Sequence, residues 1–575
     1  DQVVDLRGNP FYLDEAGERW VKETEAAMTP HEKVCQLFAD PLMGKSREEL
    51  IQFLEEYPLA AIPFRAALYG NEEAQDIMAE LQERAKIPYL YAGNCESGPN
   101  GALKGGTLVA SGAQVRATRD ARYAYEVGRI TGSETSAVGY NWTFGPVGDI
   151  YGNWRNSLIN TRAYGSDPQF VSDCVEAYNK GCMEYGVVPC LKHFPGDGWE
   201  ERDQHLAISN NGLTCEEWDK TYGKIYQTAI NHGVLSIMAA HFTLPAYQKK
   251  LNPQLEERDM QPACLSRELI GGLLRGRLGF HGLVVTDQTK MMGYYGMSRL
   301  DAIPLSIACG CDMILGINDI EEDVEAMKAG LKSGIVTEER LTEAIYRILA
   351  CKAAIGLHRR KESGSFHPGK EALARIGCRE HLEIAREASQ KAVTLVKNTK
   401  GQLPLSPEVY KKIGVFVLSG NVGSLNSSYG QGVQSGGSDQ ITERILAALK
   451  KYGYEPELMV SSVNKGKIAD FKAKYDAVMI FADITSFAQT NSVRLLWPHP
   501  MSSCYPWYIH DVPTVFTSFN YTNHLVDVAR VPAFINAYND TPETVDETVK
   551  RIAGLAPFEG NYDEDVWCGM WDTHF

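Results

Sequence analysis

The sequence predicts an α/β protein: a (β/α) barrel followed by a smaller three-layer α/β sandwich. Through the first two-thirds of the chain, short apolar runs alternate with helical patterns, and most of these runs end in a polar residue. Uninterrupted apolar strands are typical of parallel sheets that are covered by helices on both faces. So many strand–helix units within about 300 residues favour a barrel over an open sheet.

Six apolar runs are expected to form strands of this barrel. They span residues 88–94, 142–147, 187–193, 235–241, 283–287 and 313–317. Helical patterns lie between them, for example over residues 121–138 and 171–185. A capping box from Thr29 to Glu32 predicts a further helix, whose apolar stripe includes Phe38. Polar residues gather at the carboxyl ends of the predicted strands, where barrels of this kind place their chemistry.

A polar stretch, residues 358–370, breaks the alternation, and we place a domain boundary there. The predicted organisation is a barrel domain over residues 1–360, a linker with a helix over 361–411 and a sandwich domain over 412–575. In the sandwich we expect strands at 413–418, 477–481, 515–518 and 533–537, and helices at 441–452 and 542–552. The Gly- and Ser-rich segment 427–437 lacks a phosphate-binding motif, so we interpret it as a flexible loop that could also reach the pocket of the first domain.

Composition excludes several classes of function. The 575 residues need more than one core, and the net charge of −16 argues against nucleic acid and anionic membranes as partners. No apolar run approaches the roughly 20 residues that span a bilayer. The 13 cysteines show no paired spacing of the kind that zinc needs, so we interpret them as buried thiols. Thiols in this number fit a reducing compartment better than secretion, so we expect a cytoplasmic protein.

Polar groups on separate segments of the first domain predict covalent catalysis. Lys192 and His193 end one predicted strand, Asp203 and His205 lie in the long loop that follows, and Asp287 ends a later strand. A carboxylate and a histidine on separate loops indicate two-step covalent catalysis on a sugar. Histidine has an unperturbed pKa of about 6.5, so it can both donate and accept a proton near neutrality. A neighbouring aspartate would fix its tautomer.

Five motifs, in order along the chain, resemble glycoside hydrolase family 3. Residues 192–198 read Lys-His-Phe-Pro-Gly-Asp-Gly and are similar to the Lys-His-Phe-Pro-Gly-x-Gly motif of the family. Residues 278–287 resemble its nucleophile strand, which has a methionine four residues further on, here Met291. The other matching segments are residues 144–149, 162–168 and 385–405. The resemblance covers nearly the whole chain and implies a TIM-type barrel followed by a sandwich domain.

Within this resemblance, the Asp-x-His loop is similar to that of the β-N-acetylglucosaminidase branch. The resemblance implies that Asp287 is the nucleophile and that His205, oriented by Asp203, is the general acid/base. The implied sugar ligands are Arg162, Lys192 and His193, and further candidates are Asn94, His241 and Met291. For His241 a role as a core histidine is an equal alternative, and we interpret Asp149 as a structural carboxylate that holds a turn.

Two positions depart from the family pattern. Asn94 stands where the family usually has an aspartate that binds outer sugar hydroxyls, so a charge-assisted hydrogen bond worth about 1–2 kcal/mol would be lost. Asp197 stands where this branch often has His or Arg, and it is expected to add negative charge near the pocket. Both departures concern the identity of the sugar more than the mechanism.

The sequence therefore predicts a retaining, exo-acting glycosidase without a metal or organic cofactor. Its expected substrate is a small molecule or oligosaccharide with a terminal β-linked sugar, above all N-acetylglucosamine. One alternative is the same fold acting on another β-glycoside, such as a glucoside, or using phosphate as acceptor. Another is a non-catalytic sugar-binding relative, against which the presence of both Asp287 and His205 argues.

Overall fold

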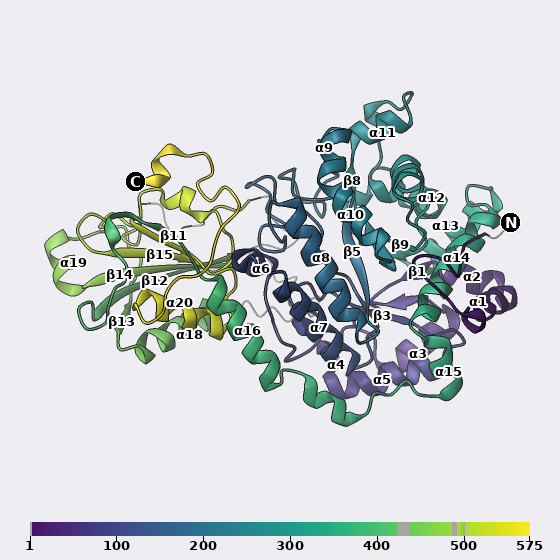
Figure 1. Ribbon diagram of the computed structural model, residues 1–575, viewed down its shortest axis with the longest axis horizontal. Helices are drawn as coiled ribbons and strands as arrows, with labels where there is room; N and C mark the ends of the chain where they lie inside the picture. The colour runs from purple at the N-terminus through teal and green to yellow at the C-terminus, as the bar shows by residue number, and fades with distance from the viewer. Residues whose placement is uncertain (1–2, 422–437, 486–491, 496, 498–500) are drawn as a thin grey trace.

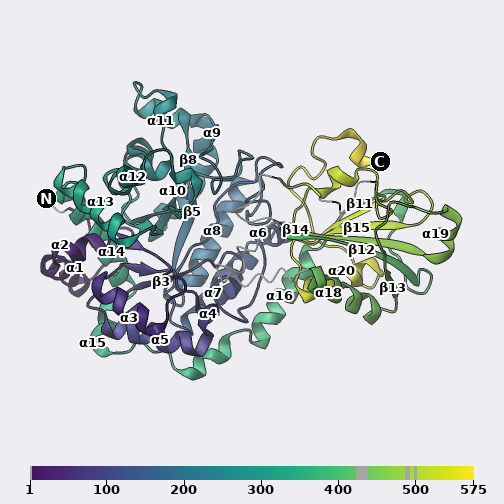
Figure 2. The same ribbon diagram turned by 180° about the vertical axis from the view of Figure 1, so that it is seen from behind.

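The structure is a computed structural model that describes residues 3–421, 438–485, 492–495, 497 and 501–575. Figure 1 shows two domains side by side, a barrel in purple to teal and a second domain in green to yellow, and Figure 2 shows them from behind. The segment 427–437, which we interpreted as a loop able to reach the pocket, lies outside the described residues.

The first domain is the predicted barrel of eight parallel strands. In spatial order these strands are β10 (Ile314–Leu315), β1 (Phe38–Ala39), β2 (Ala61–Ile62), β3 (Leu90–Gly93), β4 (Trp142–Thr143), β5 (Val188–Phe194), β7 (Ser236–Ala239) and β9 (Leu283–Thr286). A parallel bridge between Val285 and Met313 closes the ring between β9 and the start of β10. Every strand residue of this barrel is buried, as expected for a sheet with helices on its outer face.

Helices connect and cover the barrel strands (Figure 1). They are α1 (Glu15–Ala27), α2 (Pro30–Cys35), α3 (Arg47–Glu56), α4 (Ala66–Tyr69), α5 (Asn71–Arg84), α6 (Gly112–Thr118), α7 (Arg122–Ser136), α8 (Pro168–Met183), α9 (Cys215–Lys220), α10 (Tyr222–Asn231), α11 (Pro245–Leu251), the π-helix η4 (Glu268–Arg277), α12 (Arg299–Ala308), α13 (Ile320–Lys332), α14 (Glu338–Ala354) and α15 (Leu357–Ser363). A two-stranded parallel pair, β6 (Ser209–Asn210) and β8 (Phe242–Thr243), lies outside the barrel sheet.

The start of the barrel differs from the prediction in one respect. The capping box at Thr29 forms as predicted, and the carboxylate of Glu32 accepts a hydrogen bond from the backbone N–H of Thr29. The helix ends at Cys35, however, and Phe38 lies in β1, where it pairs with Ile314. The prediction that Phe38 belongs to the apolar stripe of the helix was wrong, because pairing with β10 buries the same side chain in the barrel wall.

The second domain is a three-layer sandwich around a six-stranded sheet. The strand order is β11 (Thr394–Asn398), β16 (Ala533–Asn536), β15 (Thr514–Ser518), β14 (Ala477–Thr485), β12 (Lys412–Asn421) and β13 (Glu455–Leu458). Only β11 is antiparallel to its neighbour, and it comes from the segment 361–411 that we predicted to be a linker with a helix. The helix in that segment is α16 (Arg379–Ala392), which lies between the domains in Figure 1.

Separate apolar clusters cover the two faces of this sheet. On one face pack α18 (Ser438–Lys451) and α20 (Pro542–Ile552), and on the other α19 (Ile468–Lys474) and the segment before β15. The 13 cysteines of the chain are all free thiols. In the part of the chain that the structure describes, no helix combines the length and the apolar character that crossing a bilayer requires.

Candidate active site

A cavity of about 230 Å³ opens at the carboxyl ends of the barrel strands. Its lining residues are Pro41, Pro63, Arg65, Asn94, Glu96, Phe144, Arg162, Lys192, His193, His205, Met238, Asp287, Gln288, Lys290, Met291 and Leu315. These residues lie on or just after all eight strands, apart from Arg162 and His205, which come from longer loops. The cavity therefore brings together most of the side chains that the sequence singled out, although they are far apart along the chain.

Asp287 follows β9 and is held rigidly at the edge of the cavity. Its backbone N–H donates to the carbonyl of Ala239 at 2.7 Å. One carboxylate oxygen accepts the N–H of Gln288 at 2.7 Å, and the other accepts the amide of Gln204 at 3.1 Å. Burial raises the pKa of Asp287, but nearby imidazoles, led by His193, outweigh burial and hold the pKa below its ordinary 3.8. The carboxylate is therefore ionised at neutral pH, as a nucleophile must be.

His205 and Asp203 form the predicted pair. Oδ1 of the buried Asp203 accepts both the backbone N–H of His205 at 2.8 Å and a hydrogen bond from its ring Nδ1 at 2.7 Å. This double contact fixes the orientation of the ring and assigns the proton to Nδ1. Proton exchange with a bound molecule would then use the other ring nitrogen, Nε2. His205 lines the same cavity as Asp287.

Glu96 organises the cationic wall of the cavity, and the sequence analysis missed this role. Its carboxylate receives two hydrogen bonds from Arg162, at 2.6 and 2.7 Å, and one from Nζ of Lys192 at 2.8 Å. Burial raises the pKa of Glu96, but the two cations outweigh it and hold the pKa far below its ordinary 4.5. Its place two residues after Asn94, at a strand end, was the available signal.

His193 is oriented by a carboxylate beneath the cavity. Its Nδ1 lies 2.6 Å from Oδ2 of Asp149, which is fully buried, and its Nε2 lies 3.4 Å from the guanidinium of Arg162. Oδ1 of Asp149 also accepts the backbone N–H groups of His193 and Asp197. Asp149 thus holds the turn after β5 and fixes the ring of His193, without lining the cavity itself.

Asp197 does not place a negative charge at the cavity, contrary to our expectation. Its side chain is buried and does not line the cavity, and it accepts a hydrogen bond from Asn156. Burial, reinforced by the neighbouring Asp149, raises the pKa of Asp197 well above 3.8. Asp197 therefore connects the loop after β5 to the loop that contains Asn156.

Gln204 is a second residue that the sequence analysis missed. Its amide N–H donates to Asp287, while its amide oxygen accepts the backbone N–H of His241 at 2.9 Å. The side chain is completely buried. Because Gln204 stands between Asp203 and His205 in the chain, it connects the loop of the predicted acid/base to the predicted nucleophile.

The three remaining candidate ligands divide into two groups. Asn94 and Met291 line the cavity. His241 does not, because its ring is buried with Nε2 at 2.9 Å from the carbonyl of Gln288 and Nδ1 at 3.2 Å from Sγ of Cys264. Burial lowers the pKa of His241, so the ring is neutral at neutral pH. Its contacts match the alternative of a core histidine that supports the segment after Asp287.

One group of side chains in the described residues brings metal-ligand atoms together, at the start of α16 and outside the cavity. It comprises Cys378, Glu380 and His381. Glu380 forms an ion pair with Arg129, and His381 contacts Glu134 at 2.7 Å. Protein partners therefore account for these two side chains, and the positive end of the helix is unfavourable for a cation.

Comparisons with known proteins agree with this architecture. Residues 29–351 match the glycosyl hydrolase family 3 N terminal domain. A β-N-acetylglucosaminidase/β-glucosidase of Cellulomonas fimi is 36% identical over the full length of both chains, and a β-hexosaminidase of Chromobacterium violaceum is 31% identical over 47% of this chain and 74% of its own.

Solved structures extend the likeness to both domains. The β-glucoside phosphorylase BglX superposes with a TM-score of 0.90 at 35% identity, covering 99% of each chain. A family 3 β-N-acetylglucosaminidase from Paenibacillus sp. gives a TM-score of 0.75 at 26% identity, covering 93% of this chain and 98% of its own. The chain therefore belongs to glycosyl hydrolase family 3 and is an exo-acting glycosidase of β-glycosides.

Proposed function

We propose that this protein releases a terminal β-linked N-acetylglucosamine with retention of configuration, through a covalent glycosyl-enzyme on Asp287. The observation that carries the proposal is the presence of Asp287 and the Asp203–His205 pair at one cavity, on segments that are more than 80 residues apart. A retaining glycosidase needs an ionised carboxylate and a separate proton donor at the same anomeric centre.

In the first step, a carboxylate oxygen of Asp287 attacks the anomeric carbon. The glycosidic C–O bond breaks, its electron pair goes to the leaving oxygen, and protonated His205 supplies the proton from Nε2. Asp203 stabilises the imidazolium before the transfer by accepting the Nδ1–H. Gln204 and the Gln288 N–H hold the two oxygens of Asp287 in place for the attack.

In the second step, water attacks the same carbon from the face that the leaving group vacated. His205 takes a proton from this water on Nε2, and the bond to Asp287 breaks with its electron pair returning to the carboxylate. Two inversions give overall retention. Arg162, Lys192 and His193 are the proposed ligands of sugar hydroxyls, and their contacts to Glu96 and Asp149 fix them before a sugar enters.

A second candidate is transfer of a glucosyl or N-acetylglucosaminyl group to phosphate. The cavity lining contains four cationic side chains, Arg65, Arg162, Lys192 and Lys290, against two carboxylates, Glu96 and Asp287. A neutral histidine as base also adds no negative charge that would repel an anionic acceptor. The likeness to the phosphorylase BglX, at 35% identity over 99% of the chain, supports this candidate.

A panel of nitrophenyl β-glycosides, assayed with and without phosphate, separates these functions. The proposal predicts the highest kcat/KM for the β-N-acetylglucosaminide, and sugar of β configuration as the first product seen by NMR. A strong increase of rate with phosphate, and a β-sugar 1-phosphate as product, would favour the second candidate. A product of α configuration, or no turnover of any β-glycoside, would overturn the proposal.

A further inference from the structure

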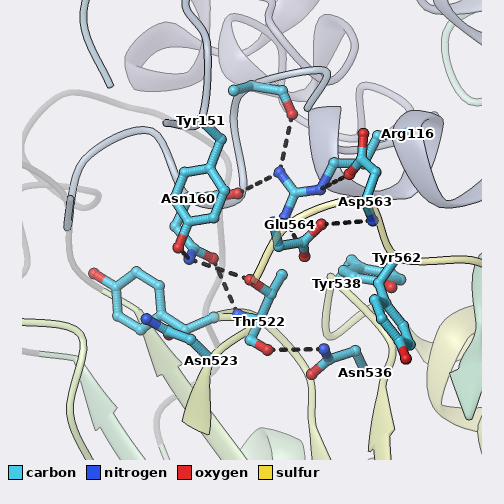
Figure 3. A network of polar contacts seen from close by, with 12 residues as sticks. Arg116, Tyr151, Asn160, Thr522, Asn523, Asn536, Tyr538, Tyr562, Asp563 and Glu564 are labelled. Atoms are coloured by element: carbon cyan, nitrogen blue, oxygen red, sulfur yellow. Dashed lines mark hydrogen bonds and ion pairs between the residues drawn. The ribbon is translucent and has the colours of Figure 1, made fainter. Parts of the chain in front are cut away.

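The second domain contacts the loop that carries Arg162 but does not itself line the described cavity. In the part of the chain that the structure describes, the last residue of the cavity lining is Leu315, in the barrel. Arg162 reaches the cavity from a loop that follows β4, and Asn160 of this loop lies against Thr522 of the second domain (Figure 3). The contacts of this short segment, residues 160–163, suggest what the second domain contributes to the site.

Arg116 of α6 fixes the backbone on both sides of Arg162. One guanidinium nitrogen donates to the carbonyl of Asn160 at 2.7 Å and to that of Ala163 at 3.2 Å. The side chain of Arg116 is only 1% exposed, so these hydrogen bonds lie in a region of low dielectric, where they are strong. A planar guanidinium can hold two carbonyls in a fixed relation, which the point charge of a lysine cannot do.

The C-terminal segment of the chain holds Arg116 in turn. Oε1 of Glu564 accepts a hydrogen bond from the second terminal nitrogen of Arg116 at 3.0 Å, and the Glu564 side chain is 2% exposed. The ring of Tyr151 lies 5.3 Å from the guanidinium carbon, at the distance of a cation–π contact. Figure 3 shows Glu564 and Tyr151 on different sides of the guanidinium, so Arg116 is held from both domains.

The second domain also holds the side chain of Asn160. The amide oxygen of Asn160 accepts the backbone N–H of Thr522 at 3.0 Å, and its amide nitrogen donates to the Thr522 hydroxyl at 3.3 Å. Nearby, the phenol of Tyr521 donates to the carbonyl of Ser157 at 3.0 Å. Backbone and side-chain contacts thus fix the same segment, and all of them involve groups that are buried.

We propose that Arg116 and Glu564 are positioning residues for Arg162, and that through them the second domain sets how tightly the cavity binds its sugar. The inference rests on the proposed function, since it takes Arg162 as a sugar ligand. A displaced segment would move the guanidinium of Arg162 away from Glu96 and from the sugar. Because Arg162 would bind sugar in the ground state and in the transition state alike, the loss should appear in KM more than in kcat.

The test compares Glu564→Gln with Glu547→Gln. Glu547 forms an equally buried ion pair with Arg551 in α20 and makes no contact with the Arg162 loop, so it controls for the general cost of losing a buried charge. On the best glycoside of the panel, Glu564→Gln should raise KM at least fivefold with kcat within twofold, while Glu547→Gln should leave KM within twofold. Glu564→Asp, which keeps the charge on a shorter side chain, should be intermediate and is the second variant if Glu564→Gln does not fold.

The double variant with Arg162→Met distinguishes positioning from a purely structural role. Once Arg162 is removed, Glu564→Gln should raise KM by less than a further twofold. If the increases in KM caused by Glu564→Gln and Arg162→Met multiply in the double variant, the inference is overturned. Equal KM values for Glu564→Gln and Glu547→Gln would also overturn it.

Hydrogen exchange tests the same claim without activity. Amides of the peptide that contains residues 160–163 should exchange at least tenfold faster in Glu564→Gln than in the wild type and in Glu547→Gln. Unchanged exchange would overturn the inference. If the wild type cleaves no glycoside, the proposed function fails, but the exchange experiment still decides whether Glu564 positions this segment.

Discussion

His205 is the residue whose proposed role makes the most specific kinetic prediction. If it donates the proton to the leaving oxygen, His205→Ala should lower kcat/KM by about 10²–10⁴-fold on a substrate with a poor leaving group. A dinitrophenyl glycoside needs little protonation, so there the loss should be at least tenfold smaller. The measurement is kcat/KM for both substrates, with His232→Ala as control, because His232 is an exposed histidine paired with Glu176. An equal loss on both substrates would contradict the role.

Some residues that line the cavity were predictable from the sequence because local pattern alone marks them. Asp287 and the pair Lys192 and His193 end apolar runs, and the carboxyl end of a barrel strand points into the mouth of the barrel. Glu96 and Gln204 were not predictable, because their roles depend on partners at distant positions in the chain. Glu96 contacts residues 66 and 96 positions away, and Gln204 contacts a residue 83 positions away.

At the level of strands and helices, the prediction found most of the barrel but missed its first two strands. The helix α7 and the barrel strands β3, β4, β7, β9 and β10 fall within the ranges that we expected, and α8 and β5 overlap the ranges expected for them. The two-residue strands β1 and β2 were missed, and β1 was missed because Phe38 was assigned to the preceding helix. The expected strand 142–147 is only two residues long as β4, since Pro146 has no N–H for the ladder.

The contact between two loops at the barrel mouth makes a second prediction. Gly198 has φ +110°, and a Cβ there would lie 1.8 Å from the carbonyl oxygen of Ile150. Gly198→Ala must therefore separate the loop that leads to His205 from the loop that leads to Arg162. We expect kcat/KM to fall at least tenfold and the free energy of unfolding to fall by about 1–3 kcal/mol.

Gly186→Ala is the matched control for this change. Gly186 also has positive φ, at +68°, but nothing lies within 4 Å of the added Cβ. This variant should show only the cost of the left-handed backbone, with kcat/KM unchanged. Activity and chemical denaturation are measured for both variants. If the two substitutions change kcat/KM equally, the loop contact is not needed for the site.

For the molecule as a whole, the interface between the two domains contains an unusual acid. Burial, reinforced by a hydrogen bond with Glu564, raises the pKa of Asp563 to about 7, even though Arg116 acts in the opposite direction. In the unfolded chain the same carboxyl ionises near its ordinary 3.8. The stability that Asp563 contributes is therefore fully present below pH 3.8 and is lost as the pH rises to about 7.

Asp563→Asn removes this titration and predicts a measurable trend. The Tm of the wild type minus that of the variant should decrease from pH 5 to pH 8, because only the wild type has an acid to ionise at this position. Ionisable groups that do not interact with Asp563 contribute equally to both proteins and cancel in the difference. A difference in Tm that stays constant over this range would show that Asp563 has no raised pKa in the folded protein.

The two-domain architecture could be predicted from the alternation of strands and helices, but the position of the boundary stays a prediction. The strand β11 shows why, because its residues 394–398 precede the polar loop to β12 and pair with β16, about 140 residues later. The contact of Arg116 with Glu564 joins residues that are further apart still, at 448 residues. The first pairing arises within the second domain and the other between the two domains, and a single sequence carries no local pattern for either.

Covalent labelling tests the proposed nucleophile most directly. The protein would be incubated with activated fluoro-sugars, 5-fluoro-N-acetylglucosaminyl fluoride and 2-deoxy-2-fluoroglucosyl fluoride, which slow the second step and let the glycosyl-enzyme accumulate. Mass spectrometry of the digested protein should find the added sugar on the peptide that contains Asp287, and no label in Asp287→Asn. A label on a different carboxylate, or labelling of Asp287→Asn at the rate of the wild type, would contradict the account.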